Sequence, residues 1–372
     1  MSEKEIEKEK VMRWLLSEQE DTIALGLTIA ETLKLDLEEF KQDISIAYRL
    51  LSSKVGISFE KQLWEISNAR GLTLRDESIL PWQIVYFVNL KSLDLTRNHF
   101  TAIPTQIGNL TQLTWLDLSA NQLNTLPTEI RNLKNLKELR LSFNQFTIIP
   151  DEIWSLTTLT NLDLGNNPLK IIPAKIGNLT DLILLDIRSI QLVALPVEIG
   201  KLIRLKELRV DENQLTSLPQ EISALINLKE LELSNNRLIS LPDEIGCLVD
   251  LERLDLTTNL LQSLPVEIEK LKKMNGLYLE ENPLSIFPIS ISKLPVLDYI
   301  ELGNCQLRTL PAEIGTLTRL TTLHLNNNQL ERLPEEIKNL TQLDSLNLTG
   351  NPISEAEQQK IRAWLPNCRI WF

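Results

Sequence analysis

Histidine and cysteine are the side chains best suited to metal binding and nucleophilic catalysis, and this chain of 372 residues has few of them. The histidines are His99 and His324, and the cysteines are Cys247, Cys305 and Cys368. None of these residues shows the close spacing of a zinc site or the pairing of a nucleophile with a base. P-loop and GxSxG motifs are also missing from the sequence. We therefore predict no catalytic site, no metal and no cofactor.

The balance of charge is acidic. The chain has 50 Asp and Glu against 38 Lys and Arg, which gives a net charge of −12 at pH 7. It lacks the clusters of Lys or Arg that could follow nucleic-acid phosphates or contact an anionic membrane. We therefore expect neither nucleic acid nor a membrane as a partner. The hydrophobic share of 43% is typical of a protein that forms a core.

The cellular location can be predicted from three features. The N-terminal sequence MSEKEIEKEKVMRW is charged throughout and lacks the apolar region of a secretory signal. The apolar run at residues 23–30 is too short to span a bilayer. An odd number of cysteines fits a reducing compartment. We expect a cytoplasmic protein, with export by a specialised secretion system left open.

The elements that position the side chains follow from an internal repeat of 23 residues. Leu90 opens the first complete unit, and further units open at the same spacing up to Leu343 without an insertion. The sequence from Leu72 to Phe87 fits the same frame as a degenerate first unit. A fixed period of this length is typical of a solenoid. A Pro recurs at the fifteenth position, and an Asn recurs at the ninth as Asn98, Asn121, Asn144, Asn167, Asn213, Asn236, Asn259, Asn282, Asn328 and Asn351.

The pattern within one unit predicts its structure. In LxxLxL, alternate residues point to opposite faces, as they do in a β-strand. A unit this small cannot bury its own leucines, so neighbouring units must stack and place their strands in one parallel sheet. The ninth-position Asn is expected to bond buried backbone groups where the chain turns. The Pro favours short 3₁₀ or polyproline segments on the outer side, and this wider layer leaves the sheet on the concave side.

The consensus LxxLxLxxNxLxxLPxxIxxL resembles the leucine-rich repeat over about residues 68–372. Its subtype is similar to Ras-group intracellular repeats and to many bacterial leucine-rich repeat proteins. The resemblance implies an α/β solenoid, a horseshoe with a concave parallel β-sheet and a 3₁₀ and polyproline convex side. The C-terminal sequence resembles bacterial caps, in which a helix replaces the Pro segment and RIWF would return as an edge strand. The expected domains are an α-helical N-terminal cap or domain at 1–66, the solenoid at 67–352 and a C-terminal cap at 353–372.

Residues 1–66 do not follow the repeat and are predicted to be helical. Ser17 begins a capping box, SEQE, before residues 23–33, which are apolar on nearly every side and predict a buried helix. Asp36 is expected to cap a second helix that ends near Gly56, and Ser58 opens a shorter third one. This region is either a cap that shields the first repeat or a small domain that also docks a partner.

Two units depart from the Asn pattern, with Ile190 and Cys305 at the ninth position. A thiol is a weak donor, whereas Ile has no polar group, and a buried backbone group left unsatisfied costs about 1–3 kcal/mol. We expect local repacking around Ile190, with a functional notch in the fifth repeat as the alternative. Cys305 is expected to be a packed thiol, and Cys368 to be buried in the C-terminal cap.

Side chains at the exposed strand positions are the candidates for partner binding. Arg140 and Arg209 each stand between carboxylates of neighbouring units and neutralise part of the face. Other carboxylates, such as Asp211 and Glu212, outnumber the arginines near them and are available to a basic partner. Aromatic residues gather in two groups, and exposed aromatics are common interface anchors. The predicted partner-binding residues are Trp115, Arg140, Phe143, Arg209, Asp211, Glu212, Glu232, Asp255, Tyr278, Glu280, Tyr299, Glu301 and His324.

These observations predict a non-enzymatic protein that binds a protein partner with a basic surface through its concave sheet. The chain itself is expected to be a monomer or a weak homodimer. Three alternatives remain open: a scaffold of a small-GTPase signalling pathway, a secreted bacterial effector or adhesin that acts on host proteins, and a structural role. In the structural role, the sheet edge or the N-terminal helices drive self-association.

Overall fold

The computed structural model describes residues 11, 14–17, 19–32, 38–51 and 59–372. It forms two compact units, Met1–Asn161 and Leu162–Phe372. Along the described chain, no helix is both long enough and apolar enough to cross a membrane.

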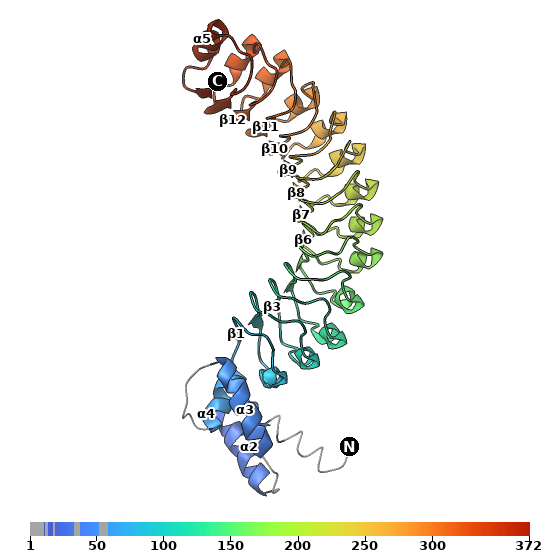
Figure 1. Ribbon diagram of the computed structural model, residues 1–372, viewed down its shortest axis with the longest axis vertical. Coiled ribbons are helices and arrows are strands. Elements are labelled where there is room, and N and C mark those ends of the chain that lie inside the picture. The colour runs from blue at the N-terminus through green and yellow to red at the C-terminus, as the bar shows by residue number, and fades with distance from the viewer. Residues whose placement is uncertain (1–10, 12–13, 18, 33–37, 52–58) are drawn as a thin grey trace. The chain divides into compact units, whose positions relative to one another are not determined.

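The first unit begins with the helices α2 (Glu20–Thr32), α3 (Glu38–Leu51) and α4 (Phe59–Asn68), drawn in blue in Figure 1. Each helix buries one apolar face, with Ile23, Ile44 and Leu63 at 2% exposure or less. Leu25 of α2 is 54% exposed, so the prediction of a helix buried on nearly every side is wrong. Among the described residues of α2, the buried ones are Ile23, Gly26 and Ala30, which lie on one face of the helix. The expected caps at Asp36, Gly56 and Ser58 lie outside the described residues.

The first repeats follow these helices. Asp43 of α3 accepts hydrogen bonds from Gln83 Nε2 at 2.9 Å and from the Tyr86 hydroxyl at 3.3 Å, which fastens α3 to the 3₁₀ helix Trp82–Tyr86. The strands β1 to β4 are paired in chain order and parallel. Their bounds are β1 (Gly71–Thr73), β2 (Ser92–Asp94), β3 (Trp115–Asp117) and β4 (Glu138–Arg140), and β5 (Asn161–Asp163) is the next strand along the chain.

The second unit continues the same pattern. Its strands are paired in chain order and parallel from β6 to β14. In Figure 1 these strands line the concave side of the unit, and the 3₁₀ helices stand on its outer side. The strands are β6 (Leu184–Asp186), β7 (Glu207–Arg209), β8 (Glu230–Glu232), β9 (Arg253–Asp255), β10 (Gly276–Tyr278), β11 (Tyr299–Glu301), β12 (Thr322–His324), β13 (Ser345–Asn347) and β14 (Arg369–Trp371).

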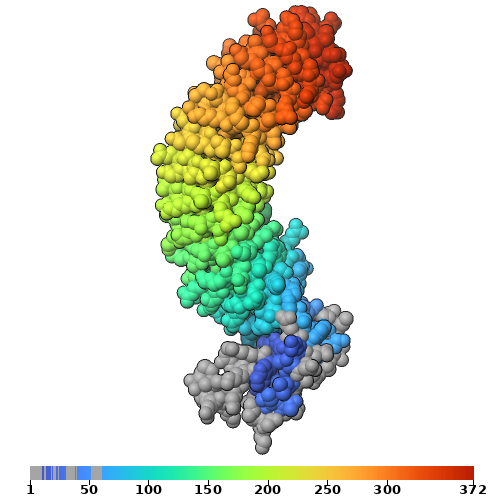
Figure 2. Space-filling view, turned by 180° about the vertical axis from the view of Figure 1, so that it is seen from behind, coloured from blue at the N-terminus to red at the C-terminus, as the bar shows by residue number. Residues whose placement is uncertain are grey.

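The core of each unit is a stack of equivalent apolar residues. Leu208 of β7 pairs with Leu231 of β8, and both side chains are fully buried. Because the repeats contain no insertion, this register recurs along the array, and the repeats of the second unit follow one another as continuous bands in Figure 2. Pro219 is extended, with φ −70° and ψ 148°, and directly precedes the 3₁₀ helix Gln220–Ala224. The recurring Pro therefore sets the entry into each outer segment.

The asparagines at the ninth position join the backbones of adjacent repeats. In the seventh repeat, Asn236 Nδ2 donates to the carbonyl oxygens of Leu233 at 3.0 Å and Val210 at 2.9 Å, while its Oδ1 accepts from the Leu215 N–H at 3.0 Å. The equivalent donation to the carbonyl three residues earlier is made by Asn98, Asn121, Asn144, Asn167, Asn213, Asn259, Asn282, Asn328 and Asn351.

Ile190 cannot make these bonds, and the backbone around it compensates. An Asn in place of Ile190 would accept a hydrogen bond from the Leu169 N–H. Here the Leu169 N–H donates instead to the Asn167 carbonyl at 2.9 Å. Asn213 of the next repeat accepts both the Ile190 N–H at 3.1 Å and the Leu192 N–H at 2.9 Å. The Leu169 N–H is therefore hydrogen-bonded, and the buried, unsatisfied backbone group considered in the sequence analysis does not occur there. Ile190 itself is fully buried.

Cys305 uses its thiol in place of the amide. Its Sγ lies 3.2 Å from the Leu279 carbonyl oxygen and 3.3 Å from that of Gly303. The Leu284 N–H turns back to the Asn282 carbonyl at 2.8 Å, as its counterpart does beside Ile190. Burial raises the pKa of the Cys305 thiol to about 12. This thiol is a packed donor, as predicted, and is poorly suited to act as a nucleophile.

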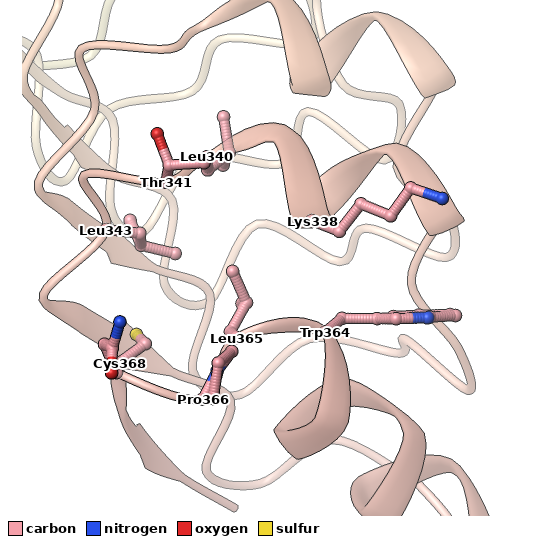
Figure 3. Close-up of a pocket in the computed structure, with 9 residues that line it drawn as sticks. Lys338, Leu340, Thr341, Leu343, Trp364, Leu365, Pro366 and Cys368 are labelled. Atoms are coloured by element: carbon pink, nitrogen blue, oxygen red, sulfur yellow. The ribbon is translucent and has the colours of Figure 1, made fainter.

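The C-terminal end has the expected helix and strand. Helix α5 (Glu355–Trp364) replaces the Pro segment, and β14 pairs with β13. A small cavity of about 160 Å³ lies between α5 and the preceding repeat, lined by residues that include Lys338, Trp364 and Cys368 (Figure 3). Cys368 is only partly buried because it lines this cavity, so the prediction of a buried residue is wrong.

Candidate partner-binding surface

The strand residues that alternate with the core leucines form what we call the sheet face, the side of the sheet that carries the third, fifth and seventh positions of each repeat. In β7, for example, Leu208 is buried while Glu207 and Arg209 on either side are partly exposed. This alternation follows from strand geometry. The sheet face thus carries most of the residues predicted to bind a partner, and each unit has its own group of them. The exceptions are Phe143 and Glu212, which stand at the eighth position of their repeats, beyond the strand.

The first unit presents Trp115, Arg140 and Phe143. Arg140 lies over the Trp115 ring, with Cζ 5.9 Å from the centroid, and its Nη1 is 3.7 Å from Asp117. Phe143 is 60% exposed and has a φ of 55°. A bulky residue rarely adopts this left-handed conformation, which costs about 1–2 kcal/mol. The backbone strain at Phe143 therefore accompanies an exposed ring that contributes nothing to the core.

In the second unit, Arg209 lies among carboxylates from three adjacent strands. Its Nη1 is 3.6 Å from Asp186, its Nε is 3.8 Å from Glu232, and its Nη2 contacts Glu207. Its position between Asp186 and Glu232 agrees with the sequence prediction. Burial raises the pKa of Glu232, although the charge of Arg209 opposes this shift. Three carboxylates thus share one guanidinium in these contacts.

Arg188 is a charged residue of this face that the sequence analysis missed. Its Nη2 contacts Asp186 at 2.5 Å and its Nε at 3.0 Å, and hydrogen bonds with Asp186 raise the pKa of Arg188. Asp211 stands nearby with its Oδ1 buried and, among the described residues, without a hydrogen-bond partner. Burial raises the pKa of Asp211, and the charge of Arg188 opposes this rise. Asp211 thus carries a buried oxygen that no described residue hydrogen-bonds, while the rest of its side chain is partly exposed.

Two other predicted carboxylates are already engaged. Glu212 accepts a hydrogen bond from the Ser189 hydroxyl. Glu280 accepts from Asn304 Nδ2 at 3.2 Å and from Asn326 Nδ2 at 3.3 Å. Each side chain keeps its negative charge, but its orientation is set by the neighbouring repeats. From the sequence, only arginines were counted as partners for these carboxylates, and neutral donors such as Ser189 and Asn304 were left out.

Three aromatic side chains form a row across successive strands. The ring centroids of Tyr278 and Tyr299 are 4.9 Å apart at an interplanar angle of 31°. His324 meets Tyr299 edge-on at 5.7 Å and 70°, and His324 Nδ1 lies 3.4 Å from Glu301. Burial raises the pKa of the Tyr299 hydroxyl to about 12, and the charge of Glu301 adds to the shift. Aromatic rings beside carboxylates attract a cation, and the guanidinium of Arg253 already lies over the Tyr278 ring.

A group of three carboxylates is the best candidate for a metal site among the described residues. Oxygens of Glu207, Glu230 and Glu232 lie within 4.8 Å of one another. Arg209 contacts both Glu207 and Glu232, however, and its positive charge disfavours a bound cation at the same place. We therefore assign this group to the charged cluster of Arg209. The two histidines could also be considered as metal ligands, but His99 belongs to the first unit of the structure and His324 to the second.

Comparison with known families identifies the repeats. Residues 72–168 and 151–236 match a leucine-rich repeat region, and residues 250–307 and 295–353 match a second leucine-rich repeat family. A single leucine-rich repeat also matches residues 227–248. Together these matches cover more than half of the chain. The chain belongs to the leucine-rich repeat proteins. No curated protein matches this leucine-rich repeat chain.

Solved structures include several similar leucine-rich repeat proteins. One from Leptospira interrogans is 44% identical, with a TM-score of 0.77 over 80% of this chain and 75% of that one. An internalin from Listeria monocytogenes is 24% identical and shares the fold, with a TM-score of 0.74 over 90% and 94% of the two chains. A plant peptide hormone receptor, solved in complex with RGF2, is 32% identical, with a TM-score of 0.66 over 81% of this chain and 49% of the receptor chain.

Proposed function

We propose that this leucine-rich repeat protein is a non-enzymatic scaffold that binds a protein partner through its sheet face. The observation that carries the proposal is the row formed by Tyr278, Tyr299 and His324, which are partly exposed. Stacking of the repeats requires buried leucines and the hydrogen-bonded asparagines at the ninth position, which we call the Asn ladder. It requires no aromatic residues on this face. Aromatic side chains are among the most frequent anchors of protein interfaces. The 32% identity to a plant receptor that binds a peptide hormone also supports a protein or peptide ligand.

The charge of the same face favours a partner with a basic surface. Asp211 and Glu232 are partly exposed carboxylates of this face, and Glu232 shares the single guanidinium of Arg209 with two other carboxylates. Asp255 and Glu301 add further negative charge on β9 and β11. A complementary positive surface would approach faster and be oriented by these carboxylates. The aromatic row would then supply the buried anchor.

The organisation of the chain is part of the proposal. Residues 1–66 act as a helical cap or small domain, residues 67–352 as the binding solenoid, and residues 353–372 as the C-terminal cap. We place the protein in the cytoplasm, because Cys247, Cys305 and Cys368 are free thiols. Among the alternatives, an exported bacterial effector or adhesin is favoured over a small-GTPase scaffold by the 44% identity to a Leptospira protein. Cell fractionation distinguishes the two locations.

Affinity capture from a native lysate tests the binding face. Wild-type protein is compared with Tyr278→Ala/Tyr299→Ala in the second unit and Trp115→Ala/Phe143→Ala in the first. Ile286→Ala is the matched control, because it removes apolar surface from a side chain that is 78% exposed and lies outside the strands. Proteins retained by the wild type and the control but lost by an aromatic variant of unchanged melting temperature support the proposal. Equal capture by all four proteins contradicts it.

A further inference from the structure

The last strand of the second unit has one open edge. β14 pairs with β13 on one side, and none of the residues that the structure describes pairs with its other side. Trp371 is 46% exposed and Arg369 is also exposed. An open strand edge is a template for pairing with another chain, unless its side chains oppose the contact. The direction of the free backbone groups and the side chains beside them therefore determine which partner fits.

The backbone groups of β14 alternate in direction. The Arg369 N–H donates to the Asp344 carbonyl at 2.9 Å, and the Trp371 carbonyl accepts from the Leu348 N–H at 2.7 Å. Both residues thus use their backbone groups toward β13. Because successive residues of a strand point their N–H and C=O groups to opposite sides, those of Ile370 are directed to the open edge. One residue with both groups free can form a hydrogen-bonded pair with an identical residue in an antiparallel strand.

We propose that the open edge of β14 pairs antiparallel with β14 of a second copy of this chain, with Ile370 on the two-fold axis. Two Ile370 residues exchange both N–H···O=C bonds, which is the arrangement of a hydrogen-bonded antiparallel pair. Arg369 of each copy then stands directly opposite Trp371 of the other copy, on the same face of the sheet. The contact is isologous, so the pair between Arg369 of one copy and Trp371 of the other occurs twice, once on each side of the two-fold axis.

The side chains favour a second copy over another extended segment. A partner strand that places an aromatic residue opposite Arg369 and a cation opposite Trp371 gains two cation–π contacts, and β14 read in the reverse direction does both. Arg362 already lies over the Phe372 ring, with Cζ 4.9 Å from the centroid, so Trp371 is the exposed aromatic residue next to the edge. The chain has a net charge of −12, and Arg362 and Arg369 reduce the repulsion between copies at this end. A contact of three residues per strand predicts a weak dimer.

Analytical ultracentrifugation over a wide concentration range tests the pairing. The wild type should pass from the 42.6 kDa monomer toward a dimer as the concentration rises. Trp371→Arg places two like-charged pairs opposite each other and should weaken the dimer about tenfold or more. Adding Arg369→Trp to this variant restores two Arg–Trp pairs and should restore the dimer. A wild type that stays monomeric, or a double variant that folds normally but stays monomeric, overturns the proposal.

Cross-linking tests the orientation directly. In a Cys247→Ser/Cys368→Ser background, chains with Arg369→Cys are mixed with chains that carry Trp371→Cys. The two thiols lie opposite each other only between unlike chains, at a non-hydrogen-bonded position where Cα atoms are about 4.5 Å apart, which suits a disulfide. The second Arg–Trp pair is retained in this mixed dimer. A disulfide in the mixture that neither chain forms alone supports the antiparallel pairing. No cross-link, or equal cross-linking in the unmixed chains, overturns it.

Discussion

The guanidinium of Arg253 covers the ring of Tyr278, with Cζ 4.5 Å from the ring centroid. Tyr299 stacks near the same ring at 4.9 Å, so one cation and two aromatic side chains lie in contact across β9, β10 and β11. The contacts restrict the rotamers of these side chains before any partner arrives. A surface ordered in this way loses less conformational entropy on binding than a mobile one. Arg253 is therefore part of the proposed binding surface, although its own ring contact is internal.

A double-mutant cycle measures this relationship. Arg253→Met and Tyr278→Leu keep much of the apolar volume while removing the charge and the ring, respectively. We expect a coupling energy of about 0.5–1 kcal/mol, as found for exposed cation–π pairs. Urea unfolding of the wild type, the two single variants and the double variant gives this energy. Strictly additive effects would mean that the two side chains are neighbours without a specific attraction.

The repeat made most of the fold predictable. Leu208 and Leu231 are in register because one repeat length separates them, and the absence of insertions carries this relation through the complete repeats. The terminal pairs differ, since Gly71 pairs with Ser92 and Ser345 pairs with Arg369. The strand at Arg369–Trp371 was also expected from the terminal sequence. Burial in the N-terminal helices was less predictable. The apolar residue Leu25 is exposed because the number of faces that a helix buries depends on its neighbours.

The details of the candidate surface depend on conformations that a repeat pattern does not contain. Arg188 bonds to Asp186 of its own repeat because its long side chain turns back along the strand, whereas the sequence analysis compared only equivalent positions of adjacent repeats. The compensation at Ile190 needs a backbone change in the preceding repeat, where Lys170 has a φ of 63°. Such local choices follow from packing and hydrogen bonding together.

Phe143→Asn should stabilise the protein and weaken partner binding. Asn tolerates the left-handed conformation better than Phe, so relief of the strain at φ 55° should raise stability by about 1 kcal/mol. Ala120→Asn is the matched control at the same position of the preceding repeat, with a φ of 54°, and it removes no ring. Thermal unfolding and partner capture are measured for both variants. If the Phe143→Asn variant is stabilised and still captures the partner, Phe143 is not an anchor.

The Asn ladder should be more sensitive to substitution than the position of Cys305. Asn236→Ile leaves the buried Leu215 N–H without its acceptor, which should cost about 1–3 kcal/mol. Cys305→Ala should cost less, because the backbone of the preceding repeat already bonds without it, as the bond from Leu284 to Asn282 shows. Denaturant unfolding compares the two variants with the wild type. An equal loss of stability in both would mean that the thiol bonds of Cys305 carry as much weight as an amide.

Asp211→Asn should increase stability at neutral pH. Burial raises the pKa of Asp211 above its unfolded value, so the folded state binds the proton more tightly and stability falls as the pH rises through this pKa. The gain from Asp211→Asn is therefore expected at pH 7 and should vanish well below pH 4 or so, where the carboxyl is protonated in both states. Melting temperatures of the wild type and the variant across this range measure the effect.

Asp94→Asn is the control of opposite sign for this measurement. Burial acts to raise the pKa of Asp94, but hydrogen bonds from Arg75 and Thr96 outweigh it and hold this pKa below its usual value. Ionised Asp94 therefore stabilises the fold, and Asp94→Asn should lower the melting temperature at pH 7 but not in acid.

A cation of the partner beside Asp211 would lower the pKa of Asp211, so Asp211→Asn should also weaken capture of a basic partner. A stabilised Asp211→Asn variant with undiminished capture would place the partner elsewhere on the sheet face.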